Sequence, residues 1–181
     1  MFARTKRLTL RPGWAEDAVE LTRTIDHQEV ARMLARVPWP YDISDAEAFL
    51  SLPTRLTEPR LLILEHVGSA AHIVGGIGLH REGDAHELGY WLTPGAWGRG
   101  IATEAGRAVI DMARDTLGLR QLHARHFLDN PASGKVLRNL GFRATGQVNG
   151  MHSRAREGAS PCATYTLDLV QEDRSVSRMA A

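Results

Sequence analysis

The residues with the clearest chemical potential lie in a short glycine-rich segment. Gly98 and Gly100 flank Arg99, and a helical pattern begins at Ile101. Glycine lets backbone N–H groups approach a ligand without a Cβ in the way, and the first turn of a helix presents unpaired N–H groups and the positive end of the helix dipole. The segment therefore predicts an anion site, suited to a phosphate or pyrophosphate, with Arg99 adding positive charge at its rim.

Two common phosphate-binding motifs do not fit this segment. The dinucleotide-binding fingerprint needs a third glycine at position 103, which is Thr103. A P-loop needs Lys followed by Ser or Thr after the last glycine, where Ile101 and Ala102 stand. The structural alternative is a strand-to-helix turn whose glycines serve only tight geometry.

The flanking sequence predicts the elements that position this turn. Residues 86–93 alternate as a strand does, and Pro94 and Gly95 end the pattern. From residue 101 apolar residues recur at helical spacing, and Gly118 ends the helix. One face of the strand would carry Leu88, Tyr90 and Leu92, and the other Glu87, Gly89, Trp91 and Thr93.

This segment resembles the acetyl-CoA-binding motif of the GNAT family of N-acetyltransferases, in which Gln/Arg-x-x-Gly-x-Gly/Ala opens a helix after a bulged strand. Residues 97–102 match it with tryptophan in the first position. That variant, with Glu-x-Gly-Tyr-Trp-Leu at 87–92, is similar to the Rim-type branch, which acetylates the N-termini of ribosomal proteins. The resemblance implies that the turn holds the pyrophosphate of acetyl-CoA and that the end of the strand holds the pantetheine arm. The cofactor-binding residues that it implies here are Trp91, Leu92, Thr93, Trp97, Gly98, Arg99, Gly100, Ile101, Ala102 and Thr103.

Amine acetylation requires a base for the amine and a donor for the tetrahedral oxyanion. Glu87 shares a strand face with Trp91 and matches, in its spacing to the glycine turn, the general base of histone-type GNAT members. The alternative is that Glu87 has only a structural role and that an ordered water acts as the base. The expected oxyanion donor is the backbone N–H of Leu92, where the strand splays.

The departing thiolate also needs a proton. Many GNAT members supply it from a tyrosine seven residues after an asparagine, a position that is Leu137 here when counted from Asn130. Ser133 matches a serine of Rim-type members and is the nearest substitute, unless it is an ordinary first-turn serine. Asn130 matches the family's pantetheine-contacting asparagine and also suits the N-cap of its own helix, and both roles are compatible. The missing tyrosine favours the alternative of a non-catalytic acyl-CoA-binding or regulatory domain.

The acceptor side offers Trp39 and Tyr41, in a loop stiffened by two prolines. These aromatic residues either wall the acceptor pocket, together with Glu87, or anchor the loop in the core. The Rim-type resemblance implies a protein N-terminal amine as the acceptor. The same scaffold also acetylates small-molecule amines, and fold analogy does not choose between them.

The remaining pattern predicts an α/β protein of the GNAT acyl-CoA N-acyltransferase fold, with a central mixed, mostly antiparallel twisted sheet and helices on both faces. Because a helix separates the strands at 86–93 and 119–127, we expect these two to be parallel. Ser44 with Glu47 predicts a capping box for a short helix. The other expected strands are 5–10, 60–67, 72–80, 142–148 and 163–170, and the other expected helical runs are 14–25, 28–36 and 131–140.

The 181 residues suit one domain, at 1–170, with a polar tail at 171–181 that we expect to be disordered. Lys and Arg number 22 against 21 Asp and Glu, so the net charge of +1 argues for neither nucleic acid nor a membrane surface as a partner. We expect a monomer or homodimer.

Metal and disulfide chemistry are not expected. His123 and His126 would face opposite sides of a strand, so they cannot share a metal ion, and acetyl-CoA is the only cofactor implied. Cys162 is the only cysteine, which excludes an internal disulfide, fits a reducing compartment and is expected to be inert. The first seven residues lack the apolar stretch of a signal peptide, so we expect a cytoplasmic protein.

Overall fold

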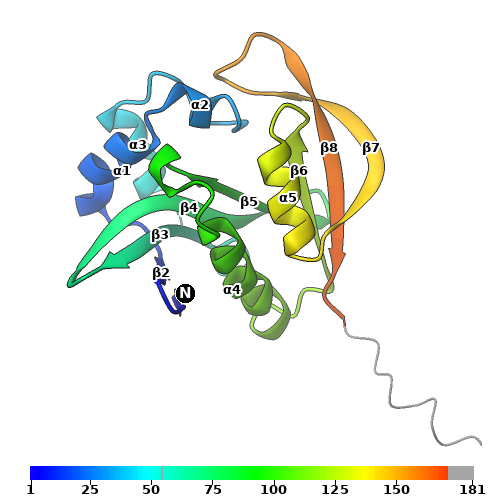
Figure 1. Cartoon of the computed structure of the whole chain (residues 1–181), viewed down its shortest axis with the longest axis horizontal. Coiled ribbons are helices and arrows are strands. Elements are labelled where there is room, and N and C mark those ends of the chain that lie inside the picture. The colour runs from blue at the N-terminus through cyan, green and yellow to red at the C-terminus, as the bar shows by residue number, and fades with distance from the viewer. Residues whose placement is uncertain (54, 171–181) are drawn as a thin grey trace, which may run out of the picture.

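The structure is a computed structural model that describes residues 1–53 and 55–170. The tail that we expected to be disordered, 171–181, lies outside these residues. The described residues form an eight-stranded sheet in the order β1-β2-β3-β4-β5-β6-β8-β7 (Figure 1). The strands are β1 (Ala3–Arg4), β2 (Leu8–Arg11), β3 (Arg60–Val67), β4 (Ala70–Glu82), β5 (Ala85–Leu92), β6 (Gln121–Phe127), β7 (Arg143–His152) and β8 (Ala159–Asp168).

The pairing of β5 with β6 is parallel, whereas every other pair in this sheet is antiparallel. The predicted mixed, mostly antiparallel sheet is therefore confirmed, and the parallel pair lies inside it, with four strands on one side and two on the other. The helix between these two strands is the crossover that parallel pairing requires. The helices are α1 (Ala18–Ile25), α2 (Gln28–Ala31), α3 (Ile43–Ser51), α4 (Ile101–Asp115) and α5 (Pro131–Asn139), with 3-10 turns η1 (Ala15–Asp17) and η2 (Pro94–Ala96).

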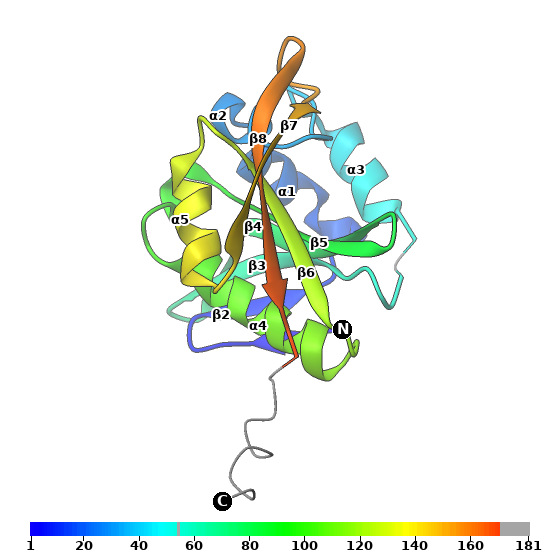
Figure 2. The ribbon, with the colours of Figure 1, turned by 90° about the vertical axis from the view of Figure 1, so that its right-hand side faces the viewer.

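Helices cover both faces of the sheet, as Figures 1 and 2 show. On one face, α4 buries Ile101, Ala105 and Val109, which recur at helical spacing, against apolar side chains of the central strands. On the other face, α1 and α3 pack Leu21 and Ala46 against β3 and β4. No helix in the described part combines the length and apolar character needed to cross a bilayer.

The strands expected at 72–80, 142–148 and 163–170 have other bounds, those of β4, β7 and β8. Three further boundaries were wrong, each for a local reason. The strand expected at 5–10 begins at Leu8, because the Thr5 hydroxyl accepts a hydrogen bond from the Leu8 N–H (3.0 Å) and holds a turn there. The capping box uses Asp42 and Asp45 instead of Ser44 and Glu47, because the Asp42 carboxylate accepts from the N–H groups of Ser44 and Asp45 at 2.8 and 3.1 Å.

The third wrong boundary is that of the helical run expected at 28–36, which stops at Ala31. Past this point the chain is bound by the loop between β7 and β8. The Ser153 hydroxyl donates to the Leu34 carbonyl (2.7 Å), and the Arg154 N–H donates to the Ala35 carbonyl (3.1 Å). These carbonyls therefore find partners outside a helix.

Glycines in β4 permit both a bulge and a close backbone approach. The β3–β4 register shifts between Ile63 and Leu64, and a Cβ on Gly75 would lie 2.2 Å from the Trp91 carbonyl oxygen. A contact that short does not occur, so no larger residue fits at Gly75 unless β4 and β5 separate.

We predict that Gly75→Ala lowers the free energy of unfolding by about 2–3 kcal/mol, the upper part of the range for overpacking, because a backbone atom cannot rotate away. Urea denaturation monitored by circular dichroism measures this change. Gly89→Ala is the matched control on the neighbouring strand, because its Cβ would contact only His80 Cε1, at 4.0 Å. Equal stability of the two variants would contradict the prediction.

Candidate active site

The glycine turn has the geometry of an anion cradle. Gly98 and Gly100 have φ angles of +70° and +76°, which favour glycine, and Gly100 is the N-cap of α4 without a side-chain cap. The first backbone bond of the helix runs from the Glu104 N–H to the Gly100 carbonyl (3.0 Å). The N–H groups of residues 101–103 therefore have no partner within the helix and are available to an anion.

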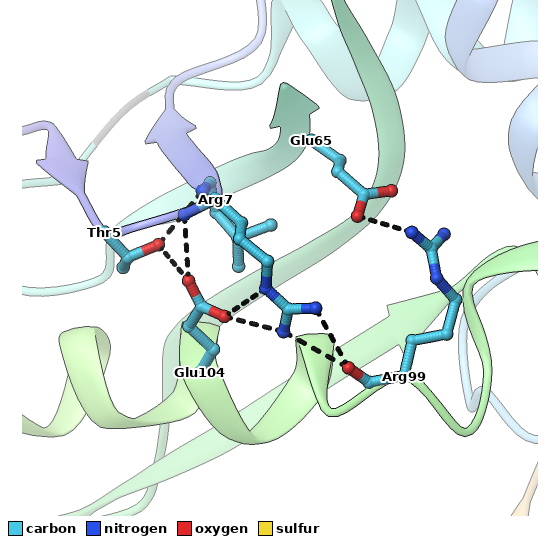
Figure 3. Close-up of polar contacts among 6 residues, drawn as sticks. Thr5, Arg7, Glu65, Arg99 and Glu104 are labelled. Atoms are coloured by element: carbon cyan, nitrogen blue, oxygen red, sulfur yellow. Dashed lines mark hydrogen bonds and ion pairs between the residues drawn. The ribbon is translucent and has the colours of Figure 1, made fainter. Parts of the chain in front are cut away.

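A polar network joins this turn to the N-terminal residues (Figure 3). The Glu104 carboxylate accepts from the Thr5 hydroxyl (2.5 Å), the Arg7 N–H (3.2 Å) and Arg7 Nε (2.8 Å). Partial burial raises the pKa of Glu104, but these hydrogen bonds prevail and hold it below its ordinary value. The Arg7 guanidinium also donates to the Arg99 carbonyl, with both contacts at 3.2 Å. The turn is thus fixed by side chains that lie outside it.

Arg99 is held by a carboxylate of β3. Its Nη2 lies 2.7 Å from Oε1 of Glu65, a side chain that is only 7% exposed (Figure 3). A nearly buried carboxylate needs such a partner. Part of the Arg99 charge is therefore committed to Glu65, although the side chain still reaches the surface beside the turn.

The end of β5 contacts the glycine turn directly. The Trp97 indole N–H donates to the Leu92 carbonyl (2.9 Å), so the Trp97 side chain links the strand to the turn. The Thr93 N–H bonds to the Val74 carbonyl (2.9 Å), and Leu92 is paired with Gly75. Because bonded and non-bonded pairs alternate in an antiparallel ladder, the Leu92 N–H points away from β4.

The Leu92 N–H faces the gap between β5 and β6. Within the described residues, these strands pair only at Glu87 and His123, and they diverge towards Leu92. The strands thus splay at this point, and the role of the Leu92 N–H as oxyanion donor stays a prediction.

The start of α5 lies against β5 at Tyr90. Asn130 is the N-cap, and its Oδ1 accepts from the Ser133 N–H (3.1 Å). The Ser133 hydroxyl lies 2.8 Å from the Tyr90 hydroxyl. Burial raises the pKa of Tyr90 to about 12, against an opposing effect of Ser133, so this phenol stays protonated at neutral pH. Leu137, at the position of the family's tyrosine, is 1% exposed in the core.

Sequence reasoning assigned Tyr90 to an apolar strand face and so missed its hydroxyl. The predicted apolar alternation of the strand was correct, but alternation does not indicate which group the hydroxyl of a tyrosine contacts. Pairing of Tyr90 with Ser133 depends on how α5 docks, which no local pattern gives.

Glu87 lies in a cluster of charged groups on the opposite face. Arg125 Nε is 2.7 Å from Glu87 Oε2, and the same guanidinium contacts Glu82. Burial raises the pKa of Glu87 above its ordinary value, an effect that Arg125 opposes. His80 is the cross-strand neighbour of Glu87, with 3.8 Å between His80 Nε2 and Glu87 Oε1. Burial and the charge of Arg36 lower the pKa of His80, which favours neutral imidazole.

His80, Glu82 and Glu87 also place possible metal-ligand atoms within 4.8 Å of one another. The Arg125 guanidinium already contacts both carboxylates, and a metal ion would have to displace or tolerate that charge. The donor set therefore suits an ion-pair cluster better than a metal centre, and the absence of a metal stays a prediction.

The floor between Glu87 and Trp91 is formed by glycine. Gly89 shares their strand face and pairs directly with Gly78 of β4. A Cβ on Gly89 would contact only His80 Cε1, at 4.0 Å, so space is open above this position. The side chain of Trp91 packs at the edge of the apolar cluster under α1 and α3, so this open floor lies on the same side as those helices.

The two aromatic residues of the acceptor loop differ in position. Tyr41 is 6% exposed and packs in the core beneath α1 and α3, whereas Trp39 is 44% exposed. Burial and the nearby Asp45 and Asp42 raise the pKa of Tyr41 to about 12. Of the two interpretations, Tyr41 fits the loop anchor, and Trp39 alone of the pair is open to a ligand.

Two cavities differ in their relation to these residues. One, of about 360 Å³, lies beside His80 and so adjoins the Glu87 cluster. The other, of about 540 Å³, is lined by Arg114, Gly118 and Leu119 at the C-terminal end of α4, the far end from the glycine turn. We therefore associate only the first cavity with the site.

Comparison with known proteins decides the family. The model of the acetyltransferase (GNAT) domain matches residues 7–143. The chain belongs to the GNAT family. The uncharacterised N-acetyltransferase p20 of Bacillus licheniformis is 30% identical over 149 residues, covering 78% of this chain and 82% of that protein. The chain is accordingly an acetyltransferase of the GNAT family.

Solved GNAT-fold structures confirm the architecture. The ribosomal-protein-S5-alanine acetyltransferase of Vibrio fischeri superposes with a TM-score of 0.77 at 17% identity, covering 93% of this chain and 96% of that one. The microcin C7 self-immunity acetyltransferase MccE, solved with acetyl-CoA and AMP, superposes with a TM-score of 0.74 at 20% identity, covering 91% and 93%. At these identities the likeness establishes the GNAT fold and no finer property.

Proposed function

We propose that this GNAT protein transfers the acetyl group of acetyl-CoA to a primary amine by direct attack in a ternary complex. The observation that carries the proposal is the free N–H cradle at residues 101–103, fixed beside the strand end whose Leu92 N–H faces a gap. The acetyl-CoA present in the MccE structure supports the choice of cofactor. The pyrophosphate would bind at residues 97–103 and the pantetheine arm along residues 91–93, with Asn130 and Ser133 alongside.

The proposed reaction assigns one step to each group. Glu87 accepts the ammonium proton, directly or through a water, and the free amine attacks the thioester carbonyl. The Leu92 N–H stabilises the oxyanion of the tetrahedral intermediate. As the carbon–sulfur bond breaks, Ser133 donates a proton to the thiolate and takes one from Tyr90, and Tyr90 regains a proton from solvent when the products leave. The Tyr90–Ser133 pair would thus supply the proton that a tyrosine supplies in other family members. This makes the alternative of a non-catalytic acyl-CoA-binding domain less favoured.

The proposed acceptor is a protein N-terminus or a small-molecule amine, with Trp39 and Glu87 on the acceptor side. The Rim-type assignment, and with it a protein acceptor, rests on the resemblance of residues 87–92 and 97–102 to that branch. The open floor at Gly89 fits either acceptor. A cytoplasmic location, a monomeric or homodimeric state and independence of nucleic acid and membrane stay part of the proposal.

We predict that acetyl-CoA and CoA raise the unfolding midpoint, and that ATP and NAD at matched concentration do not. A ligand at 100 times its dissociation constant stabilises by about 2.7 kcal/mol, which shifts the midpoint of a domain of this size by a few degrees. Differential scanning fluorimetry measures the shift. No shift with either CoA species, or a larger shift with a nucleotide, would remove the anion cradle from the proposal.

Thiol release from acetyl-CoA in the presence of amines then tests the transfer itself. Burial raises the pKa of Cys162 to about 11, and the residue is fully buried, so the protein's own thiol adds little background. Stabilisation by acetyl-CoA without transfer to peptides or small amines would favour the non-catalytic alternative.

A further inference from the structure

The cavity beside His80 is rich in positive charge. Three arginines line it, Arg36, Arg55 and Arg60, against one carboxylate, Glu58. Arg55 is paired with Glu58 at 3.0 Å, and Arg60 donates to backbone carbonyls of the chain before it. Arg36 forms no ion pair with any residue in the described ranges. Its guanidinium is therefore the one most available to an incoming anion.

The backbone that carries Arg36 is fixed. The carbonyls of the two preceding residues, Leu34 and Ala35, accept from Ser153 and Arg154 at 2.7 and 3.1 Å. Figure 1 shows the β7–β8 loop reaching over to the chain that follows α2. A long side chain on a fixed backbone loses less freedom on binding than one on a mobile loop, so Arg36 is partly preorganised.

The same cavity adjoins the proposed base. His80 lines the cavity, and its Nε2 lies 3.8 Å from the Glu87 carboxylate and 4.0 Å from the Glu82 carboxylate. Two carboxylates, Glu82 and Glu87, face a single guanidinium, Arg125, so this cluster keeps a net negative charge. Arg36, in contrast, brings to the adjoining cavity a positive charge that forms no ion pair among the described residues. An ammonium group is attracted to the carboxylates and an anionic group to Arg36.

We infer that the acceptor is a small amine that also carries a carboxylate or a phosphate group, with its amine at Glu87 and its anionic group at Arg36. This inference rests on the proposed acetyl transfer and specifies the acceptor. The volume of about 360 Å³ lies at the lower end of small-molecule sites, which favours a small amine over a polypeptide. The anionic group is recognised by a guanidinium, which binds carboxylate and phosphate alike.

The experiment compares amines that differ only in the anionic group. β-Alanine is paired with β-alaninamide, and phosphoethanolamine with ethanolamine, in the thiol-release assay. We expect kcat/KM to be at least about 10-fold higher for the anionic member of one pair or both, the size of one charge-assisted hydrogen bond. Added salt should reduce this preference. The two pairs distinguish carboxylate from phosphate.

Arg36→Gln should abolish the preference and leave kcat/KM for the neutral amines within about two-fold, since the substitution removes only the partner of the anion. Arg143→Gln is the control, because Arg143 lies at the start of the edge strand β7 and is 80% exposed. Equal rates within both pairs, or a preference that survives Arg36→Gln, would overturn the inference and leave acetyl transfer intact. Transfer confined to peptide N-termini would do the same.

If no amine is acetylated, the proposed function fails, and binding decides the inference separately. The same four amines are then added to CoA-saturated protein in the unfolding assay. An upward shift with anionic amines alone, lost in Arg36→Gln, would retain an anionic-amine site. No shift would overturn it.

Discussion

Glu87→Gln is expected to lower turnover about 100-fold, the lower end of the contribution of a general base, while the stabilisation by acetyl-CoA stays unchanged. Glutamine keeps the size and a hydrogen-bond acceptor for Arg125 but cannot take a proton. Steady-state thiol release and the unfolding midpoint measure the two effects. The Glu87 carboxylate lies away from the anion cradle, on the opposite face of β5 from Leu88 and Leu92, so cofactor affinity is independent of it.

The pH profile gives a second test of Glu87. A base must be deprotonated, so turnover should rise as the pH passes upward through its pKa. Because burial raises that pKa, the midpoint of the acidic limb of the rate profile should lie at a higher pH than the ordinary pKa of a glutamate. Glu87→Gln should remove this limb. Glu82→Gln is the matched control in the same cluster, with a carboxylate that is 53% exposed. An unchanged rate in Glu87→Gln would exclude Glu87 from the mechanism and point to a water as base.

Gly89→Val should lower kcat/KM for the amine by about 100-fold or more and leave the fold and acetyl-CoA binding intact. Gly89 lies midway between Glu87 and Trp91 on one strand face, about 7 Å from each. A valine side chain would fill the open space above the strand, and a displacement of about 1 Å in a bound reactant already costs about 100-fold. The same steady-state assay measures the loss.

Gly89→Ala provides a graded comparison, because its single methyl group enters open space and meets only His80 Cε1, at 4.0 Å. It should retain most of the activity and nearly all of the stability. Full activity in Gly89→Val would show that the acceptor does not cross this face of β5, and the acceptor site would have to be sought elsewhere.

The parts of the fold that depend on local pattern were predictable. The alternation at 86–93, the glycine turn and the apolar stripe from Ile101 each specify an element within a few residues, and the intervening helix dictates the parallel pair. The errors at Thr5 and Asp42 arose where a side chain bonded to nearby backbone and moved a boundary. Patterning alone does not choose between neighbouring capping residues.

The candidate site was predicted from local features at the strand end, the glycine turn and the start of α5. Gly100 and Leu92 were proposed because a turn and a strand end are local features. Arg125, which forms an ion pair with Glu87, comes from the next strand and depends on register. Arg7, which holds the glycine turn, is 97 residues away from Glu104. Contacts between residues so far apart in the sequence depend on how the elements dock, and no local spacing in the sequence predicts them.

Because Arg7 reaches Glu104 from beside the edge strand β1, retention of the proposed cofactor would depend on fraying at the sheet edge. β1 is a two-residue edge strand, the kind of element that opens locally at small free-energy cost. Each opening that carried Arg7 away would release the Arg99 carbonyl and the Glu104 carboxylate together, and the loop would lose its shape while the core stayed folded. Amide exchange in β1 and β2 and the dissociation rate of the bound cofactor should therefore rise and fall together.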